Sequence, residues 1–248
     1  MTELARLPYP DVEVLLTAER PTVLLLPLGA TEPHGPHAPL ETDTLISAGI
    51  CRRVAERLAD DPDVRAVVLP PLPYGVTRYA AAFPGTVSIG EATLRALVLE
   101  LSRSLAAQGF GRIVLVNSHF EPEQVRTLRD AVAELAGGVR LLDLTRRENA
   151  ERLTDEFRSG SCHAGRYETS LVLADDPELV RRERMETLKS RMIDMPAAIA
   201  AGQTDFIAMG MDRAYCGAPA EATAEEGERT FETLTELLIG LVREVAAC

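Results

Sequence analysis

The sequence predicts an α/β fold, a three-layer α/β/α sandwich with a mostly parallel central sheet. Short apolar runs alternate with longer segments of helical periodicity, and the runs are continuous, as in strands buried on both faces. Because right-handed crossovers place connecting helices on both faces of a parallel sheet, this alternation implies three layers. A chain of 248 residues is within the range of one such domain, so we expect residues 1–248 to form a single domain.

Four short apolar runs are the predicted strands. The first, residues 22–28, has the sequence TVLLLPL and is followed by Gly29, which favours a buried strand over a helix. The later predicted strands are residues 65–69, 112–116 and 139–144.

The segments between these runs have helical spacing. Residues 43–58 repeat apolar side chains on one face, and Asp43 or Thr44 is the expected N-cap. Further helices are predicted over residues 91–107, 122–135 and 222–247, the last of them long and amphipathic.

Three other segments are less regular. Residues 165–173 are expected to form another ordered element. The charged stretch 146–160 is expected to be a surface excursion, and both it and residues 181–191 could form flaps or subunit contacts.

Composition excludes several classes of protein. With 38 acidic and 26 basic residues, the chain has a formal charge of −12 and repels both phosphate backbones and anionic lipid. The N-terminal residues have no long apolar core, and no apolar run reaches the length of a membrane span. We therefore expect a cytoplasmic protein that binds neither nucleic acid nor membrane.

The four histidines all lie in short polar clusters at the ends of predicted elements. His34 and His37 follow the first strand, His119 follows the strand at 112–116, and His163 lies before the element at 165–173. In an open parallel sheet, ligands bind at the carboxyl ends of the strands. The loops carrying His34 and His119 should therefore meet.

These loops also carry carboxylates. Glu32 precedes His34, and Asp43 can point back to the same crevice from the start of its helix. Imidazole and carboxylate ligands suit zinc, manganese or iron(II), and such an ion can activate water for attack on a carbonyl. Glu32, His34, Asp43 and His119 are the predicted metal ligands, and hydrolysis of an amide-like bond is the simplest use of such a site.

Simpler interpretations stand beside this one. An isolated Glu-x-His pair is usually a solvated loop, and His37 is expected to have a loop role or to support a ligand. Glu121 at a helix start is favourable without any metal, and Glu168 could merely pair with Arg166. Placement of separate clusters at one sheet edge is what favours the metal site.

The residues resemble those of the creatininase (creatinine amidohydrolase) family over roughly residues 20–245. Residues 26–37, LPLGATEPHGPH, followed by Thr42-Asp43-Thr44, are similar to its signature. Further matches occur in the same order at residues 71–77 (PLPYGVT), 83–86 (FPGT), 116–119 (VNSH), 163–165 (HAG), 168–170 (ETS) and 217–219 (GAP).

The resemblance implies two divalent metal ions, zinc, manganese or iron, and a metal-activated water as nucleophile. It assigns Glu32 and His119 to one ion, His34 and Glu121 to the other, and Asp43 as the bridge between them. The remaining roles that it implies are His163 as proton shuttle, Glu168 as an acid or a group behind the metal, and Thr77 and Phe120 as pocket residues. The candidate catalytic residues are thus His163, Glu168 and Glu121, and the expected assembly is a homo-oligomer, a hexamer built from dimers.

Departures from the family pattern concern the substrate. Relatives that act on creatinine enclose it with tryptophans, and this chain has no tryptophan. Arg78 and Tyr79 stand near the place where relatives often have a histidine, which indicates a different substrate, for example an anionic one that pairs with Arg78. The predicted function is a metal-dependent amidohydrolase acting on a cyclic amide or another non-standard C–N amide bond of a small molecule. The alternatives are a deformylase or peptide-processing hydrolase in a biosynthetic pathway, or a non-catalytic metal-binding scaffold.

Overall fold

A computed structural model describes residues 3–135 and 137–247 of the chain. The described residues form a four-stranded sheet in which every neighbouring pair of strands is parallel, in the order β2-β1-β3-β4. The strands are β1 (Thr22–Leu28), β2 (Arg65–Val68), β3 (Ile113–Asn117) and β4 (Val139–Leu142). The predicted parallel sheet is confirmed.

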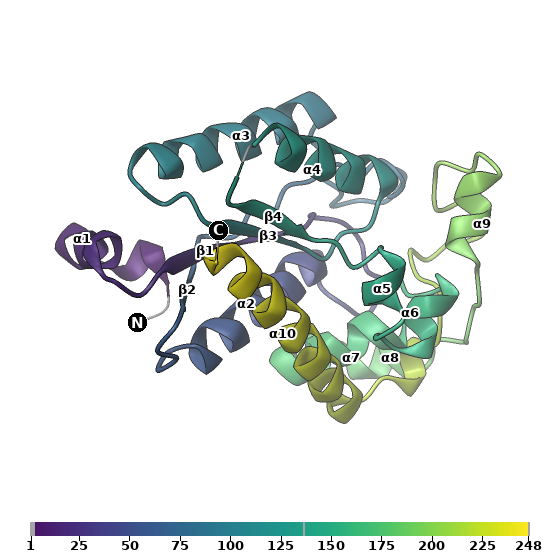
Figure 1. The fold of residues 1–248 in the computed structure, drawn as a ribbon. Coiled ribbons are helices and arrows are strands. Elements are labelled where there is room, and N and C mark those ends of the chain that lie inside the picture. Colours follow the sequence, from purple (N-terminus) through teal and green to yellow (C-terminus); the bar gives the residue numbers. More distant parts are fainter. Residues whose placement is uncertain (1–2, 136, 248) are drawn as a thin grey trace.

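Helices cover both faces of the sheet (Figure 1). One face packs against α2 (Thr42–Arg57) and α10 (Ala224–Ala246), and the other against α3 (Glu91–Ala107) and α4 (Pro122–Glu134). Successive residues of β1 alternate between the two cores: Val23 and Leu25 belong to the first, Leu24 to the second. Because β1 is buried on both of its faces, its sequence TVLLLPL is almost continuously apolar. The predicted three-layer sandwich is confirmed.

One helix behind the sheet connects this core to the site. Helix α7 (Arg166–Asp175) packs against both α2 and α10, and its buried Tyr167 and Leu171 join the core on that face. The element expected over residues 165–173 is therefore a helix. Helix α10 begins after Thr223, whose hydroxyl accepts the Glu226 N–H as an N-cap.

Two expectations about local structure are wrong. Helix α2 begins at Thr42 with Glu41 as its N-cap, so neither Asp43 nor Thr44 caps it. The carboxylate of Asp43 is instead turned towards His34 and His119. The stretch 146–160 is also not only a surface excursion, because Glu156 and Phe157 within it are buried.

Shorter elements surround this framework. They are η1 (Leu4–Arg6), α1 (Tyr9–Thr17), α5 (Arg147–Ala150), α6 (Asp155–Ser159), η2 (Pro177–Leu179), α8 (Arg182–Met185), α9 (Met195–Ala200) and η3 (Pro219–Glu221). Helix α9 lies within residues 191–217, here called the 191–217 segment. Its end residues, Arg191 and Gly217, pair as an antiparallel bridge. Among the described residues, no helix has the length and apolar character that crossing a bilayer requires.

Candidate metal centre

The strand order creates a crevice between β1 and β3. These neighbouring strands lead into helices on opposite faces, since α2 packs on one side of the sheet and α4 on the other. At such a switch point the loops that leave the two strands diverge and leave room for a ligand. Glu32 and His34 follow β1, and His119 follows β3, so their side chains enter the crevice from its two sides.

The first group of potential ligands comprises Glu32, Asp43 and His119, all buried. His119 Nδ1 lies 3.2 Å from Glu32 Oε1 and 3.2 Å from Asp43 Oδ2. Two ligand atoms that are each about 2.1 Å from a tetrahedral ion lie roughly 3.4 Å apart. The three side chains are therefore spaced as ligands of one cation.

The second group comprises His34, Asp43 and Glu168, also buried. His34 Nε2 lies 3.2 Å from Asp43 Oδ1 and 3.4 Å from Glu168 Oε2. Asp43 thus directs one carboxylate oxygen to each group. This is the arrangement in which a carboxylate bridges two adjacent ions.

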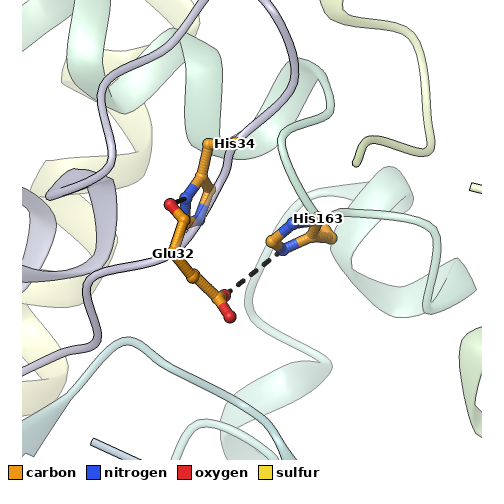
Figure 2. A group of neighbouring side chains, drawn as sticks. All are labelled: Glu32, His34 and His163. Carbon is orange, nitrogen blue, oxygen red and sulfur yellow. Dashed lines mark hydrogen bonds and ion pairs between the residues drawn. The ribbon is translucent and has the colours of Figure 1, made fainter. Parts of the chain in front are cut away.

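A third group of potential ligands consists of Glu32, His34 and His163, so His163 lies beside one residue from each of the first two groups (Figure 2). Its Nδ1 is 3.8 Å from Glu32 Oε1, and its Nε2 donates to the Pro33 carbonyl at 3.1 Å. The ring lies between those of His34 and Phe206, with centroid distances of 4.6 and 4.5 Å. His163 is therefore held with one nitrogen free towards the crevice.

Hydrogen bonds behind the ligands fix which nitrogen faces the crevice. His119 Nε2 is 2.8 Å from the Val76 carbonyl and His34 Nδ1 is 3.1 Å from the Glu32 carbonyl. Because a carbonyl only accepts, these nitrogens donate, which leaves His119 Nδ1 and His34 Nε2 as lone pairs for a metal. The Thr77 hydroxyl donates to the second oxygen of Glu32 and orients that carboxylate.

The electrostatics of the centre favour positive charge. Burial alone lowers the pKa of His34, but the carboxylates of Asp43 and Glu168 outweigh it and raise the pKa to about 10. Burial raises the pKa of the Glu168 carboxyl to about 8, although His34 lowers it. Burial also works against the charged form of Asp43, yet His34 and His119 hold its pKa well below the usual range. Without other cations, the buried carboxylates would retain protons on their histidine neighbours.

A divalent cation fits this donor set. Glu32, Asp43 and Glu168 place three carboxylates in one buried volume, and carboxylates so close repel each other unless a positive charge lies between them. His34 Nε2 and Asp43 Oδ2 are buried and make no hydrogen bond, although both point into the groups described above. Imidazole and carboxylate ligands are those of zinc, manganese and iron.

The structure places the other predicted residues as follows. The carboxylate of Glu121 is outside both groups and accepts the backbone N–H groups of Arg78 and Tyr79, at 2.9 and 3.1 Å. Glu168 occupies the place beside His34 that the resemblance assigned to Glu121. The Arg78 guanidinium is an exposed partner of Glu91, and neither Arg78 nor Thr77 lines the cavity described next. Their contact with a substrate stays a prediction.

His37 is also separate from the centre. It is buried, and its Nε2 is hydrogen-bonded to the Thr169 hydroxyl at 2.8 Å. It joins neither of the ligand groups, so this placement matches the supporting role that the sequence suggests.

A cavity of about 300 Å³ opens from the centre. The titratable residues that line it are Glu32, Asp43, His119, Glu121, His163 and Glu168, so Glu121 faces the cavity although it joins neither ligand group. Its apolar wall is formed by Phe120, Ala150, Phe157, Met195, Pro196, Ile199 and Phe206. Of these wall residues, only Phe120 was predicted. The others lie in residues 146–160 and in the 191–217 segment, where apolar residues scattered among charged ones do not indicate in the sequence that they line a cavity.

The chain is similar to known proteins over most of its length. The model of the Creatininase family, described as creatinine amidohydrolase, matches residues 5–242. A mycofactocin precursor peptide peptidase of Mycolicibacterium smegmatis is 37% identical over 211 residues, which cover 84% of this chain and 79% of that protein. The creatinine amidohydrolase of Pseudomonas putida is 31% identical over 247 residues, covering 90% and 89%.

Solved structures are similar over almost the whole chain. A structure described as creatininase Mn has a TM-score of 0.74 and 28% identity, covering 98% of both chains. A mutant creatininase of Zn-Zn type has the same TM-score and identity, covering 97% of this chain and 96% of that one.

Proposed function

This chain belongs to the creatininase (creatinine amidohydrolase) family and is a hydrolase of carbon–nitrogen bonds; we propose that it uses two divalent ions to hydrolyse an amide bond in a peptide-like substrate. The observation that carries the proposal is the pair of ligand groups that share Asp43 at the end of an apolar cavity.

We assign a first ion to Glu32, Asp43 and His119 and a second ion to His34, Asp43 and Glu168. The lone pairs of both histidines point into these groups because their other nitrogens are held by backbone carbonyls. The names of two similar structures, creatininase Mn and the Zn-Zn type, support manganese or zinc as the metal.

Bound divalent ions would lower the pKa of a water molecule and polarise the substrate carbonyl. The residues of the chain then have separate tasks. The carboxylates of Glu32 and Asp43 hold the positive charge in place, and His163 moves a proton between the nucleophile and the leaving nitrogen. Burial and the neighbouring His34 lower the pKa of His163 to about 4, so its imidazole is neutral near pH 7.

The cavity supports a peptide-like substrate over a small ring. The sequence has no tryptophan, and the wall instead carries Phe120, Phe157 and Phe206 together with the flexible side chain of Met195. Such a wall binds apolar groups next to the scissile amide and excludes water from it. The similarity to the mycofactocin precursor peptide peptidase supports the same class of substrate.

A cyclic amide is the second candidate. It is supported by the similarity to the creatinine amidohydrolase of Pseudomonas putida. The two candidates differ in what they require of the cavity: a cyclic amide needs only its polar end, whereas a peptide also occupies the apolar wall.

The test is an assay of metal-stripped protein reloaded with Zn²⁺, Mn²⁺ or Fe²⁺. The panel contains creatinine, simple lactams, formamides and short peptides with apolar or charged side chains. We expect hydrolysis of apolar peptides to be the fastest, and hydrolysis of creatinine alone would instead favour the cyclic amide. No hydrolysis by any reloaded form would favour a non-catalytic scaffold.

Two histidine variants separate the roles within this assay. His163→Ala should lower kcat by about 100- to 10,000-fold with its metal content unchanged, as loss of a general acid–base does. His37→Gln, in the neighbouring loop but outside the ligand groups, should stay within a few-fold of the wild type. Equal rates for wild type and His163→Ala would exclude the proposed proton transfer.

A further inference from the structure

Two glycine-containing segments, residues 163–165 and 217–219, meet at a carboxylate that takes no part in either ligand group. Glu156 of helix α6 is buried, with 5% of its surface exposed. Its Oε2 accepts the Tyr167 N–H at 2.6 Å, and its Oε1 accepts the Ala218 N–H at 2.7 Å. One side chain thus ties together two segments that are distant in the sequence.

Glycine is required in both segments because backbone carbonyl groups, together with this carboxylate, lie close to their α-carbons. A Cβ atom at Gly165 would lie 2.7 Å from Glu156 Oε2 and 2.8 Å from the Cys216 carbonyl oxygen. A Cβ atom at Gly217 would collide with the Ser161 carbonyl oxygen as well as with Glu156 Oε1, and Gly217 also has a φ of +78°. The packing of the backbone around Glu156 therefore explains these two glycines.

Glu156 also supplies what the start of helix α7 lacks. The N-cap of that helix is Gly165, which has no side chain to accept the free N–H groups of the first turn. The carboxylate of Glu156 accepts one of them and brings a negative charge to the positive end of the helix dipole. Helix α7 is therefore anchored at its first turn, which carries Glu168.

The anchored backbone leads directly to the metal centre. The Cys216 N–H donates to the His163 carbonyl at 2.9 Å, beside the Ala218 N–H that Glu156 accepts. The Ala164 N–H donates to Glu168 Oε2 at 2.7 Å, the same oxygen that lies 3.4 Å from His34 Nε2. Ala164 has a φ of +49°, a strained value for alanine that persists only where its surroundings impose it.

From these contacts we propose that Glu156 is a positioning residue, which aims Glu168 at the second ion and holds the turn of His163. It acts through the backbone N–H groups of Tyr167 and Ala218 and touches neither substrate nor metal. The proposal rests on the two-ion site of the proposed function.

The decisive variant is Glu156→Gln, which keeps the size of the side chain but replaces one acceptor oxygen by an N–H donor. An N–H group would then face the N–H of Tyr167 or Ala218. The matched control is Asp155→Asn, its neighbour in α6, whose side chain is exposed and, among the described residues, forms an ion pair with Arg166. Metal content and the affinity of each ion are measured by titrating stripped protein with Mn²⁺ or Zn²⁺.

We expect Glu156→Gln to weaken the binding affinity for the second ion by about 10- to 100-fold, as loss of a residue that orients a metal ligand does. The affinity for the first ion should be unchanged. With an active substrate, kcat should fall and KM should change by less than about threefold. Asp155→Asn should behave as the wild type. Glu156→Asp, which keeps the charge but has a shorter reach, should give an intermediate loss and serves if Glu156→Gln does not fold.

Wild-type affinity for both ions in Glu156→Gln and Glu156→Asp would overturn the proposal. Equal weakening of both ions would overturn it too, because Glu32, Asp43 and His119 do not depend on Glu156. The titration needs no substrate, so a wild type that binds two ions but hydrolyses nothing would contradict the proposed function alone.

Discussion

Phe206 links the wall of the cavity to the reactive imidazole. It is buried, lines the cavity, and stacks on the ring of His163. Its backbone N–H donates to the Tyr79 carbonyl at 2.9 Å, and this hydrogen bond fixes the backbone that carries the ring. Without the ring of Phe206, the His163 imidazole could rotate away from the orientation in which its Nδ1 faces Glu32.

We therefore expect Phe206→Ala to lower the rate of hydrolysis by about tenfold or more, the size of effect that misplacing a catalytic group produces. The control is Ile207→Ala, because the next residue has 49% of its surface exposed and does not line the cavity. Steady-state kinetics with equal metal loading would check this. A Phe206→Ala enzyme as active as Ile207→Ala would show that the stacking has no role.

His37 predicts a dependence of stability on pH. Burial, together with the nearby positive charge of His34, lowers the pKa of His37 to about 4 from 6.5. The unfolded chain then binds more protons than the folded one between about pH 6.5 and pH 4, so the free energy of unfolding falls as the pH drops through that window. The loss attributable to His37 is about 2 kcal/mol at pH 5.

Denaturant unfolding of wild type and His37→Gln at pH 7 and pH 5 measures this loss. The wild type should lose more stability than the variant over this interval, and stability curves that run parallel would contradict the assignment. Comparing the two proteins removes the contribution of the metal ligands, which they share.

The residues of the centre were predictable where their chemistry is distinctive. Glu32, His34, Asp43 and His119 follow strands whose carboxyl ends meet, and the structure brings their side chains together. Glu168 could not be assigned from its residue type alone, because its place beside His34 depends on how α7 packs. Phe157, Met195 and Phe206 were missed because an apolar residue that lines a cavity has the same sequence signal as one in a core.

At the scale of elements, the long periodic segments were predicted and the short ones were not. All four strands and the helices α2, α3, α4 and α10 lie within a few residues of their predicted positions. Helices such as α5, α6 and α9 have only four to six residues, too few for a periodic pattern. Their structure is set by tertiary contacts, such as those of the buried Glu156 and Phe157.

The contact between α7 and α10 gives a prediction at this scale. Gly227 of α10 lies so close to the backbone of Ser170 in α7 that an added Cβ atom would collide with the Ser170 carbonyl. Gly227→Ala should therefore lower the free energy of unfolding by about 1–3 kcal/mol, because overpacking costs more than the improved helix propensity returns.

Gly240 provides the control within the same helix. Nothing lies within 4 Å of the position of its added Cβ atom, so Gly240→Ala should stabilise the protein by about 0.5–1 kcal/mol. Denaturant unfolding of both variants compares them. Equal effects at the two positions would mean that the helices separate readily and that α7 does not hold Glu168 rigidly.

For the whole molecule, the buried carboxylates predict that metal binding and folding are coupled. Ions that bind only the folded chain should raise its stability by about 2.7 kcal/mol at a concentration one hundred times Kd. Treatment with a chelator should therefore lower the midpoint of thermal unfolding, and Zn²⁺ or Mn²⁺ should restore it.

Asp43→Asn tests where this coupling arises, because Asp43 is shared by both ligand groups. Its unfolding midpoint should respond much less to added metal than that of the wild type. A wild type whose midpoint is the same with and without chelator would contradict the prediction. The expected homo-oligomer and its hexameric form stay predictions at this scale.

The two ends of the 191–217 segment lie side by side, since Arg191 and Gly217 exchange backbone hydrogen bonds of 2.8 and 2.7 Å. The segment is thus an insert closed at its base, and it supplies wall residues such as Met195 and Phe206 but none of the five groups assigned to the ions. Wall residues of this segment that do not contact His163, such as Met195 and Ile199, can therefore be exchanged without altering the groups assigned to the ions. Substitutions at these wall positions would change which amide substrates the cavity accepts, while the side chains assigned to the ions stay the same.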